Sequence, residues 1–147
     1  ALAVSAKAGI PRYETLQPEY NLMARDFEKE LAPLCARHEV GVIPYYGLAS
    51  GFLTGKYRSK ADLKQSPRGE DVEAYLAPRG FKVLDALDAV AKRHGATPAQ
   101  VALAWLMTKV TAPIASATNL KQLGDLAASA RLELDASDIA RLEAASS

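Results

Sequence analysis

Cysteine is almost absent from this chain of 147 residues, and histidine is scarce. Cys35 is the single cysteine, which excludes a disulfide framework and a cysteine-rich zinc site. The two histidines fit no HExxH or other metal-ligand spacing, so we expect no metal. A single unpaired cysteine fits a reducing compartment, and we therefore expect a cytoplasmic protein.

An excess of charge of one sign is also missing. Eighteen Lys and Arg residues oppose 17 Asp and Glu residues, which leaves a net charge of +1 and excludes the basic surface that nucleic acid or an anionic membrane requires. No apolar run approaches the roughly 18 to 20 residues that cross a bilayer. We expect no targeting segment, although the chain opens on Ala1 in what resembles the middle of a helix.

The apolar spacing alternates between strand and helix patterns, as in β/α units. The expected helices and strands, in chain order, are a helix tail at Ala1–Ala8, a strand at Tyr13–Leu16, a helix at Asp26–His38, a buried strand at Val40–Tyr46, a long loop at Arg58–Asp71, a helix from Phe81 to Gly95, an apolar helix at Pro98–Thr108, a strand at Ala112–Ala115, a helix capped by Thr118, and a last helix capped by Asp135. This order predicts an α/β fold on a parallel sheet. Three strands cannot close a barrel, which needs eight, so the pattern indicates an incomplete domain.

Three residues of types that often carry chemistry have plainer interpretations here. His38 and His94 both fall in the last turn of a helix, where an imidazole interacts favourably with the carbonyl end. Cys35 lies on the apolar face of its helix and is expected to be a core thiol. No catalytic role is predicted for any of the three.

Two turns could bind an anion. Tyr45, Tyr46, Gly47, Leu48, Ala49, Ser50 and Gly51 follow a buried strand and lead into a short helix, where backbone N–H groups can approach a phosphate. The alternative is a plain strand-to-helix turn, and the residues alone favour neither. Ser116–Asn119 follows the last strand in the same way, with simple helix capping as its alternative. Lys56 and Arg68 could fold over the first turn as a cationic lid, or be ordinary surface charges.

Three segments together resemble a known family. They are LQPEYNLMAR, VIPYYGLASGFLTGKYR and TPAQVALAWLMTKVTAPIASATNLKQLGDLA, in this order. They resemble the C-terminal part of the aldo-keto reductases, and the resemblance covers essentially all of residues 1–147. It implies a (β/α)8 TIM barrel of which this chain supplies strands six to eight with their helices, and NADP(H)-dependent reduction of aldehydes and ketones.

The resemblance also assigns a role to each matching position. Gln17 would contact the nicotinamide carboxamide, and Tyr45 would stack on the nicotinamide ring. Residues Tyr46 through Ser50 would wrap the pyrophosphate beneath Lys56 and Arg68. The adenosine end with its 2′-phosphate would be held by Ser116, Thr118, Gln122 and Asp125.

The family's catalytic aspartate, tyrosine, lysine and histidine have no counterparts in this chain. The isolated chain is therefore expected to be inactive, because nothing in it protonates a carbonyl oxygen. Two alternatives remain open: a non-enzymatic nucleotide-binding module, like the family's channel-associated subunits, and a structural remnant that binds nothing. The open sheet edges of an incomplete barrel predict self-association.

Overall fold

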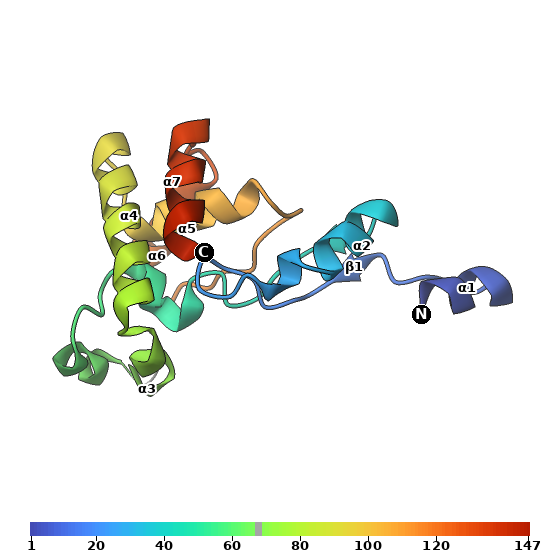
Figure 1. Ribbon diagram of the computed structural model, residues 1–147, viewed down its shortest axis with the longest axis horizontal. Helices are drawn as coiled ribbons and strands as arrows, with labels where there is room; N and C mark the ends of the chain where they lie inside the picture. Colours follow the sequence, from blue (N-terminus) through green and yellow to red (C-terminus); the bar gives the residue numbers. More distant parts are fainter. Residues whose placement is uncertain (67–68) are drawn as a thin grey trace.

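A computed structural model gives the fold of the chain and describes residues 1–66 and 69–147. The first half holds few regular elements and the second half is mostly helical (Figure 1). The helices and strands are α1 Leu2–Ala8, β1 Thr15–Leu16, α2 Leu31–Arg37, β2 Gly41–Val42, α3 Gly69–Val72, α4 Pro78–His94, α5 Pro98–Met107, α6 Leu120–Ser129 and α7 Ala136–Ser146. Short 3-10 helices occupy Asp26–Glu28, Ala49–Thr54, Lys60–Gln65 and Glu73–Tyr75.

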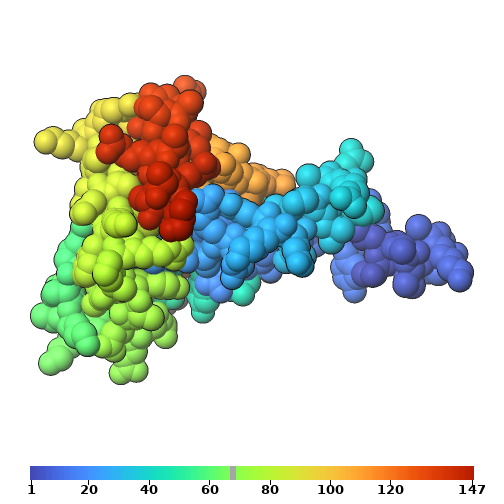
Figure 2. Space-filling view, viewed as in Figure 1, coloured from blue at the N-terminus to red at the C-terminus, as the bar shows by residue number. Residues whose placement is uncertain are grey.

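Helix α1 lies apart from the rest of the molecule, at one end of its longest axis (Figures 1 and 2). It ends where predicted, because Gly9 adopts the left-handed conformation at φ 63° and its amide bonds back to the carbonyl of Ser5. The chain then runs as an extended segment into β1.

Strands β1 and β2 form a parallel pair in which Thr15 lies opposite Gly41 and Leu16 opposite Val42. Both strands were predicted, but both are shorter than expected. Pro18 and Pro44 have no N–H group to donate to a ladder, so regular pairing stops before each of them. Parallel alignment nevertheless continues, since the amide of Tyr45 donates to the carbonyl of Pro18 over 3.0 Å.

The prediction of a strand at Ala112–Ala115 is wrong, because within the described residues the sheet contains β1 and β2 alone. The segment does run beside β2, because the amides of Thr111 and Ala112 both donate to the carbonyl of Val42 and that of Ile114 donates to Pro44. Pro113 interrupts the ladder by removing a donor from its middle. The path of a third strand is present without its regular pairing.

Two other predictions need correction. The helix expected over Asp26–His38 is divided into a 3-10 turn and α2, and Pro33 lies in the first turn of α2, where a missing N–H costs little. The loop expected at Arg58–Asp71 contains the 3-10 helix Lys60–Gln65 and the start of α3. Ser59 and Asp62 form a capping box that starts the 3-10 helix.

Helix α5 is the centre of the core. As its all-round apolar sequence predicted, every residue from Val101 to Leu106 is buried. Helices α4 and α6 pack against it, and α7 packs against α4. Trp105 is fully buried, and its ring lies 5.6 Å from that of Tyr20, in the segment that follows β1. This contact joins the strand-bearing half to the helical half.

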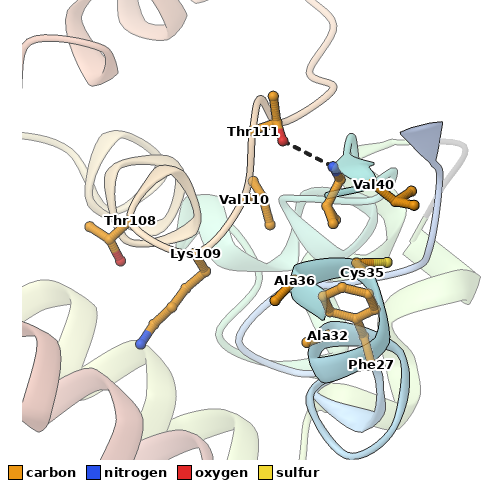
Figure 3. A pocket seen from close by; sticks show the side chains of 10 residues that line it. Phe27, Ala32, Cys35, Ala36, Val40, Thr108, Lys109, Val110 and Thr111 are labelled. Carbon is orange, nitrogen blue, oxygen red and sulfur yellow. Dashed lines mark hydrogen bonds between the residues drawn. The ribbon is translucent and has the colours of Figure 1, made fainter. Parts of the chain in front are cut away.

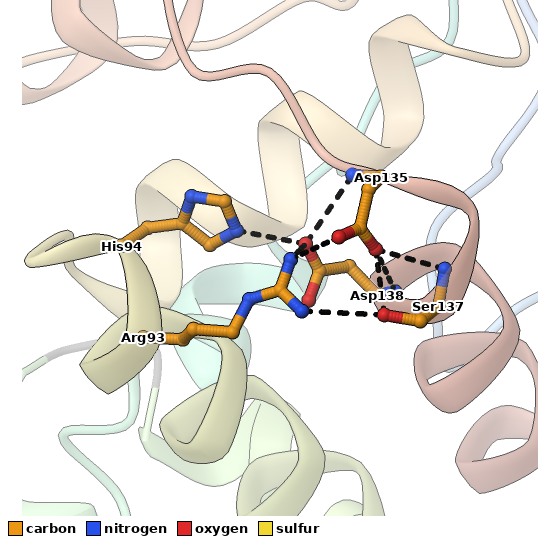
Figure 4. Close-up of polar contacts among 5 residues, drawn as sticks. All are labelled: Arg93, His94, Asp135, Ser137 and Asp138. Carbon is orange, nitrogen blue, oxygen red and sulfur yellow. Dashed lines mark hydrogen bonds and ion pairs between the residues drawn. The ribbon is translucent and has the colours of Figure 1, made fainter.

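Polar side chains hold the end of α4 against the start of α7. Arg93 donates to both Asp135 and Asp138, while Nε2 of His94 lies 2.7 Å from Oδ2 of the buried Asp138 (Figure 4). The predicted cap of the last helix is confirmed, since the Asp135 carboxylate accepts from the amides of Ser137 and Asp138. His94 lies in the last turn of α4, as predicted, but its ring contacts the Asp138 carboxylate of α7 and not the carbonyl end of its own helix.

Candidate functional site

Three chain segments end side by side at one edge of the structure. The amide of Ile43 donates to Leu16 over 2.9 Å, and that of Ile114 donates to Pro44 over 3.0 Å. These bonds bring the residues after β1, after β2 and after the 112–115 segment to the same edge. In parallel α/β folds ligands bind at this carboxyl edge.

The turn after β2, residues 45–51, has an unusual backbone. Tyr46, Ala49 and Ser50 have φ values of 54°, 49° and 54°, and Gly51 has a φ of 92°. Left-handed conformations are uncommon in residues other than glycine and concentrate at functional sites. Three of them within five residues mark this turn as a strained segment that its surroundings hold in place.

The turn leaves backbone donors unused. The amide of Ala49 donates to the carbonyl of Tyr46 over 2.7 Å and that of Gly51 donates to Leu48 over 2.9 Å. Within residues 1–66 and 69–147, no hydrogen bond occupies the N–H groups of Gly47 and Leu48. Unpaired N–H groups in a concave backbone turn are the usual ligands of a bound anion.

Gly47 allows the turn to lie close against α5. A Cβ added at this position would come within 3.0 Å of Leu106 Cδ2 and 3.5 Å of Leu103 Cδ2. A side chain at position 47 would require the end of Leu106 to shift by a few tenths of an ångström. Glycine at this position thus lets the turn pack tightly on α5.

Asn21 supports the turn from the opposite side, and sequence reasoning missed it. Its Nδ2 donates to the carbonyl of Tyr46 over 2.9 Å, although 25 residues separate the two. Its Oδ1 accepts from the amides of Met23 and Ala24, and the side chain is buried. An asparagine between the apolar residues Tyr20 and Leu22 was the available signal, since a buried amide must find partners.

The aromatic residues at the start of the turn are open to solvent. Tyr45 is 40% exposed and Tyr46 54%, and their ring centroids lie 5.1 Å apart at an edge-on angle of 68°. An edge-on neighbour supports the Tyr45 ring without covering both of its faces. Gln17 is exposed, one residue beyond β1 at the same edge.

A cation stands beside the end of the turn. A Cβ built at Gly51 would lie 3.5 Å from Nζ of Lys56, which also sits 4.8 Å from the ring centroid of Tyr57. The other predicted lid residue, Arg68, lies outside the described residues. Arg58 is not free to serve instead, because it is bound to Asp88 and to the carbonyl of Gly55.

The second predicted turn is a helix start whose cap differs from the expected one. Asn119, and not Thr118, caps α6, because its side chain accepts from the amide of Gln122 over 2.9 Å. Thr118 donates through both its amide and its hydroxyl to Oε1 of Gln122. These side chains and Ser116 are exposed at the start of α6.

Asp125 is held by neighbouring residues. Oδ1 accepts from Nε2 of Gln100 on α5, and Oδ2 pairs with Lys121 one turn earlier, both at 3.2 Å. Gly47 links this region to the first turn, since its Cβ position would lie 3.7 Å from the carbonyl of Ile114. The first turn therefore lies against the 112–115 segment, which leads along the chain into the second turn.

Cys35 lies away from this edge. It lines a cavity of about 410 Å³ with Phe27, Val42 and Lys109, near the start of β2 (Figure 3). The thiol is buried, as predicted for a core residue. Thr111 closes one side of the cavity by accepting from the amide of Val42 over 3.0 Å.

Two kinds of feature are absent from the described ranges 1–66 and 69–147. No three His, Cys, Asp or Glu side chains there gather in a way that could hold a metal ion. No helix in those ranges is long and apolar enough to span a membrane.

Comparisons with known proteins point to one family. A family model described as the aldo/keto reductase family matches residues 2–147. The chain is 33% identical over 151 residues to the protein Tas of Escherichia coli, covering 97% of this chain and 42% of that protein. It is 32% identical over 131 residues to "Probable aldo-keto reductase 1" of Glycine max, covering 84% of this chain and 37% of that protein.

The chain thus spans less than half the length of these relatives. The match nevertheless extends over nearly the whole chain, including both turns described above. The chain belongs to the aldo/keto reductase family and matches a C-terminal part of it.

Proposed function

We propose that this chain is the cofactor-binding C-terminal part of an NADP(H)-dependent aldo-keto reductase. It would supply strands six to eight of a (β/α)8 barrel, with the path of strand eight running through 112–115. The observation that carries the proposal is the turn 45–51, which combines left-handed residues, two unpaired N–H groups and the neighbouring ammonium of Lys56. These features fit a pyrophosphate.

The remaining residues fit the two ends of such a cofactor. The half-exposed ring of Tyr45 offers a face for stacking, and Gln17 at the same edge offers an amide to the carboxamide. The exposed start of α6 would hold the adenosine end and its 2′-phosphate through Ser116, Thr118, Gln122 and Asp125. Arg68 would join Lys56 over the pyrophosphate.

The bound cofactor would supply the hydride for reduction of a small carbonyl substrate. This chain's part would be to hold the cofactor: N–H groups would donate hydrogen bonds to the pyrophosphate, Lys56 would add a positive charge, and Tyr45 would orient the ring. No residue here is assigned to protonate the carbonyl oxygen. We infer that this step belongs to the part of the barrel that the relatives have and this chain does not.

Two further properties go with this proposal. The outer edge of β1 has no partner strand within the described residues, so it would pair with another part of the barrel or with a second copy. We also propose a cytoplasmic location, which accords with the single buried thiol.

Thermal unfolding with and without excess NADPH tests the binding role. A ligand at 100 times its dissociation constant adds about 2.7 kcal/mol of stability, which would raise the melting temperature by several degrees. The matched control is NADH at the same concentration, which lacks the 2′-phosphate. An unchanged melting temperature with both nucleotides would contradict cofactor binding by this chain.

Turnover tests the division of roles. We expect the chain to bind NADPH yet oxidise it with a simple aldehyde far more slowly than about 1 per second, a rate typical of enzymes. A rate of that order would show that this chain holds a proton donor of its own.

A further inference from the structure

The side chain of Asn21 contacts two separate segments of the chain. Its Oδ1 accepts from the amides of Met23 and Ala24 at 2.8 and 3.0 Å, and these bonds shape its own loop. Its Nδ2 donates to the carbonyl of Tyr46, in the cofactor turn. Because the acceptor and the donor of this one amide serve different segments, a substitution can separate them.

The carbonyl that Asn21 reaches is the one on which the turn folds. Tyr46 adopts a φ of 54°, which a residue with a Cβ rarely does. Its carbonyl accepts from the amide of Ala49 at 2.7 Å and from Asn21 at 2.9 Å, so the two donors together fix its direction. The next two residues, Gly47 and Leu48, carry the unpaired N–H groups.

The loop that carries Asn21 does not need this bond for its own fold. Arg25 binds both carboxylate oxygens of Glu28 and the hydroxyl of Ser146 at 2.8 Å. Arg79 donates to the carbonyls of Met23 and Ser146. The loop is anchored to the last turn of α7 by contacts that do not involve residues 45–51. The Nδ2 donor of Asn21 therefore acts on the turn 45–51 and not on its own loop.

We propose that Asn21 is a positioning residue for cofactor binding: its Nδ2 holds the Tyr46 carbonyl and thereby keeps the Gly47 and Leu48 N–H groups directed at the pyrophosphate. The inference rests on the proposed cofactor role of the turn. It adds a residue that lies outside the turn and does not touch the cofactor.

Substitution Asn21→Asp tests this directly. A carboxylate keeps the acceptor for Met23 and Ala24 but has no hydrogen for the Tyr46 carbonyl. We expect NADP+ binding about tenfold weaker than wild type at pH 8.5, the effect of losing about one buried hydrogen bond. Burial raises the pKa of a carboxyl, and its protonated form can donate again, so the deficit relative to wild type at the same pH should shrink at pH 6.

Tyr20→Phe is the matched control. It removes a buried hydroxyl from the adjacent position of the same loop without touching the turn. We expect it to lower stability and leave NADP+ affinity unchanged. Equal weakening of NADP+ binding in both variants, or unchanged affinity in Asn21→Asp at both pH values, would overturn the proposal.

Amide hydrogen exchange gives a reading that needs no cofactor. In Asn21→Asp at pH 8.5 the amide of Ala49, which bonds to Tyr46, should exchange faster, while those of Met23 and Ala24 stay protected. Unchanged protection at Ala49 would overturn the positioning role. A wild-type chain that binds no NADP+ would overturn the proposed function, and the exchange result would still decide whether Asn21 holds the turn.

Discussion

Tyr20 donates its hydroxyl hydrogen to Oε1 of Glu28 over 2.6 Å, within the core contact that joins the two halves of the chain. Burial and this hydrogen bond to a carboxylate both raise the pKa of Tyr20 above its ordinary range. Burial alone would raise the pKa of Glu28 as well, but the hydrogen bonds from Arg25 and Tyr20 hold it below its ordinary value. The pair is thus a neutral phenol bound to an ionised carboxylate.

This pair predicts a loss of stability at alkaline pH. The folded pKa of Tyr20 lies above the unfolded value of about 10, so its contribution is complete below pH 10 and declines as pH rises further. Tyr20→Phe should lower the free energy of unfolding by about 2 kcal/mol at pH 7. Urea melts from pH 8 to 11 should show the difference from wild type shrinking above pH 10, and a constant difference would contradict the assignment.

Asp135 predicts the opposite dependence at acid pH. Hydrogen bonds from Ser137 and Arg93 hold the pKa of this helix-capping carboxyl below its ordinary value. Its stabilisation is therefore present above the unfolded pKa of about 3.9 and is lost as pH falls below it. Asp135→Asn keeps a capping oxygen without the charge, so its urea midpoint should fall less between pH 5 and pH 2 than that of wild type. Parallel curves would show that the charge contributes nothing.

The backbone at Gly51 predicts a penalty for a side chain in the turn 45–51. At a φ of 92° an added Cβ is strained, so Gly51→Ala should cost about 1–2 kcal/mol of stability and weaken NADPH binding. Gly9→Ala is the control, because Gly9 also has a positive φ but lies beyond the end of the separate helix α1. Fluorescence titration should show weaker binding in the first variant alone.

Lys56 predicts a dependence of affinity on charge and on salt. Lys56→Ala should weaken NADPH binding about tenfold. The difference in affinity from wild type should be smaller at 1 M salt, because screening already weakens the attraction between Lys56 and the cofactor phosphates. Lys60→Ala removes a similar charge that is largely exposed and paired with Glu73. Isothermal titration at two salt concentrations compares them, and equal effects of the two substitutions would indicate a general charge effect.

The sequence predicted those features that depend on neighbouring residues. Local rules of capping and burial predict the end of α1 at Gly9, the start of α7 after Asp135 and the burial of α5. The strands are shorter than their apolar pattern predicts. Pro44 and Pro113 remove ladder donors from segments whose side chains otherwise suit a sheet.

The candidate site also combines features that neighbouring residues predict with features that they do not. The turn 45–51 was located from its own residues, but its strain could not be, since four positive φ values arise from packing against α5 and from Asn21. Asn21 itself acts on a carbonyl 25 residues away. Its place between Tyr20 and Leu22 indicates a buried amide but not which carbonyl that amide binds. The assignment of Thr118 as the cap failed because Asn119 competes for the same role and is a slightly better cap.

The anchoring of the Asn21 loop also bears on how the chain folds. Arg25 and Ser146 are 121 residues apart, so their contact closes a loop that spans most of the chain. Contacts of such sequence separation form late, because the entropy of closing the loop must be overcome before they contribute. During synthesis from the N-terminus, Arg25 and Arg79 cannot bind Ser146 until the last turn of α7 has been made. The loop that contacts the Tyr46 carbonyl is therefore held on its α7 side only after α7 has formed.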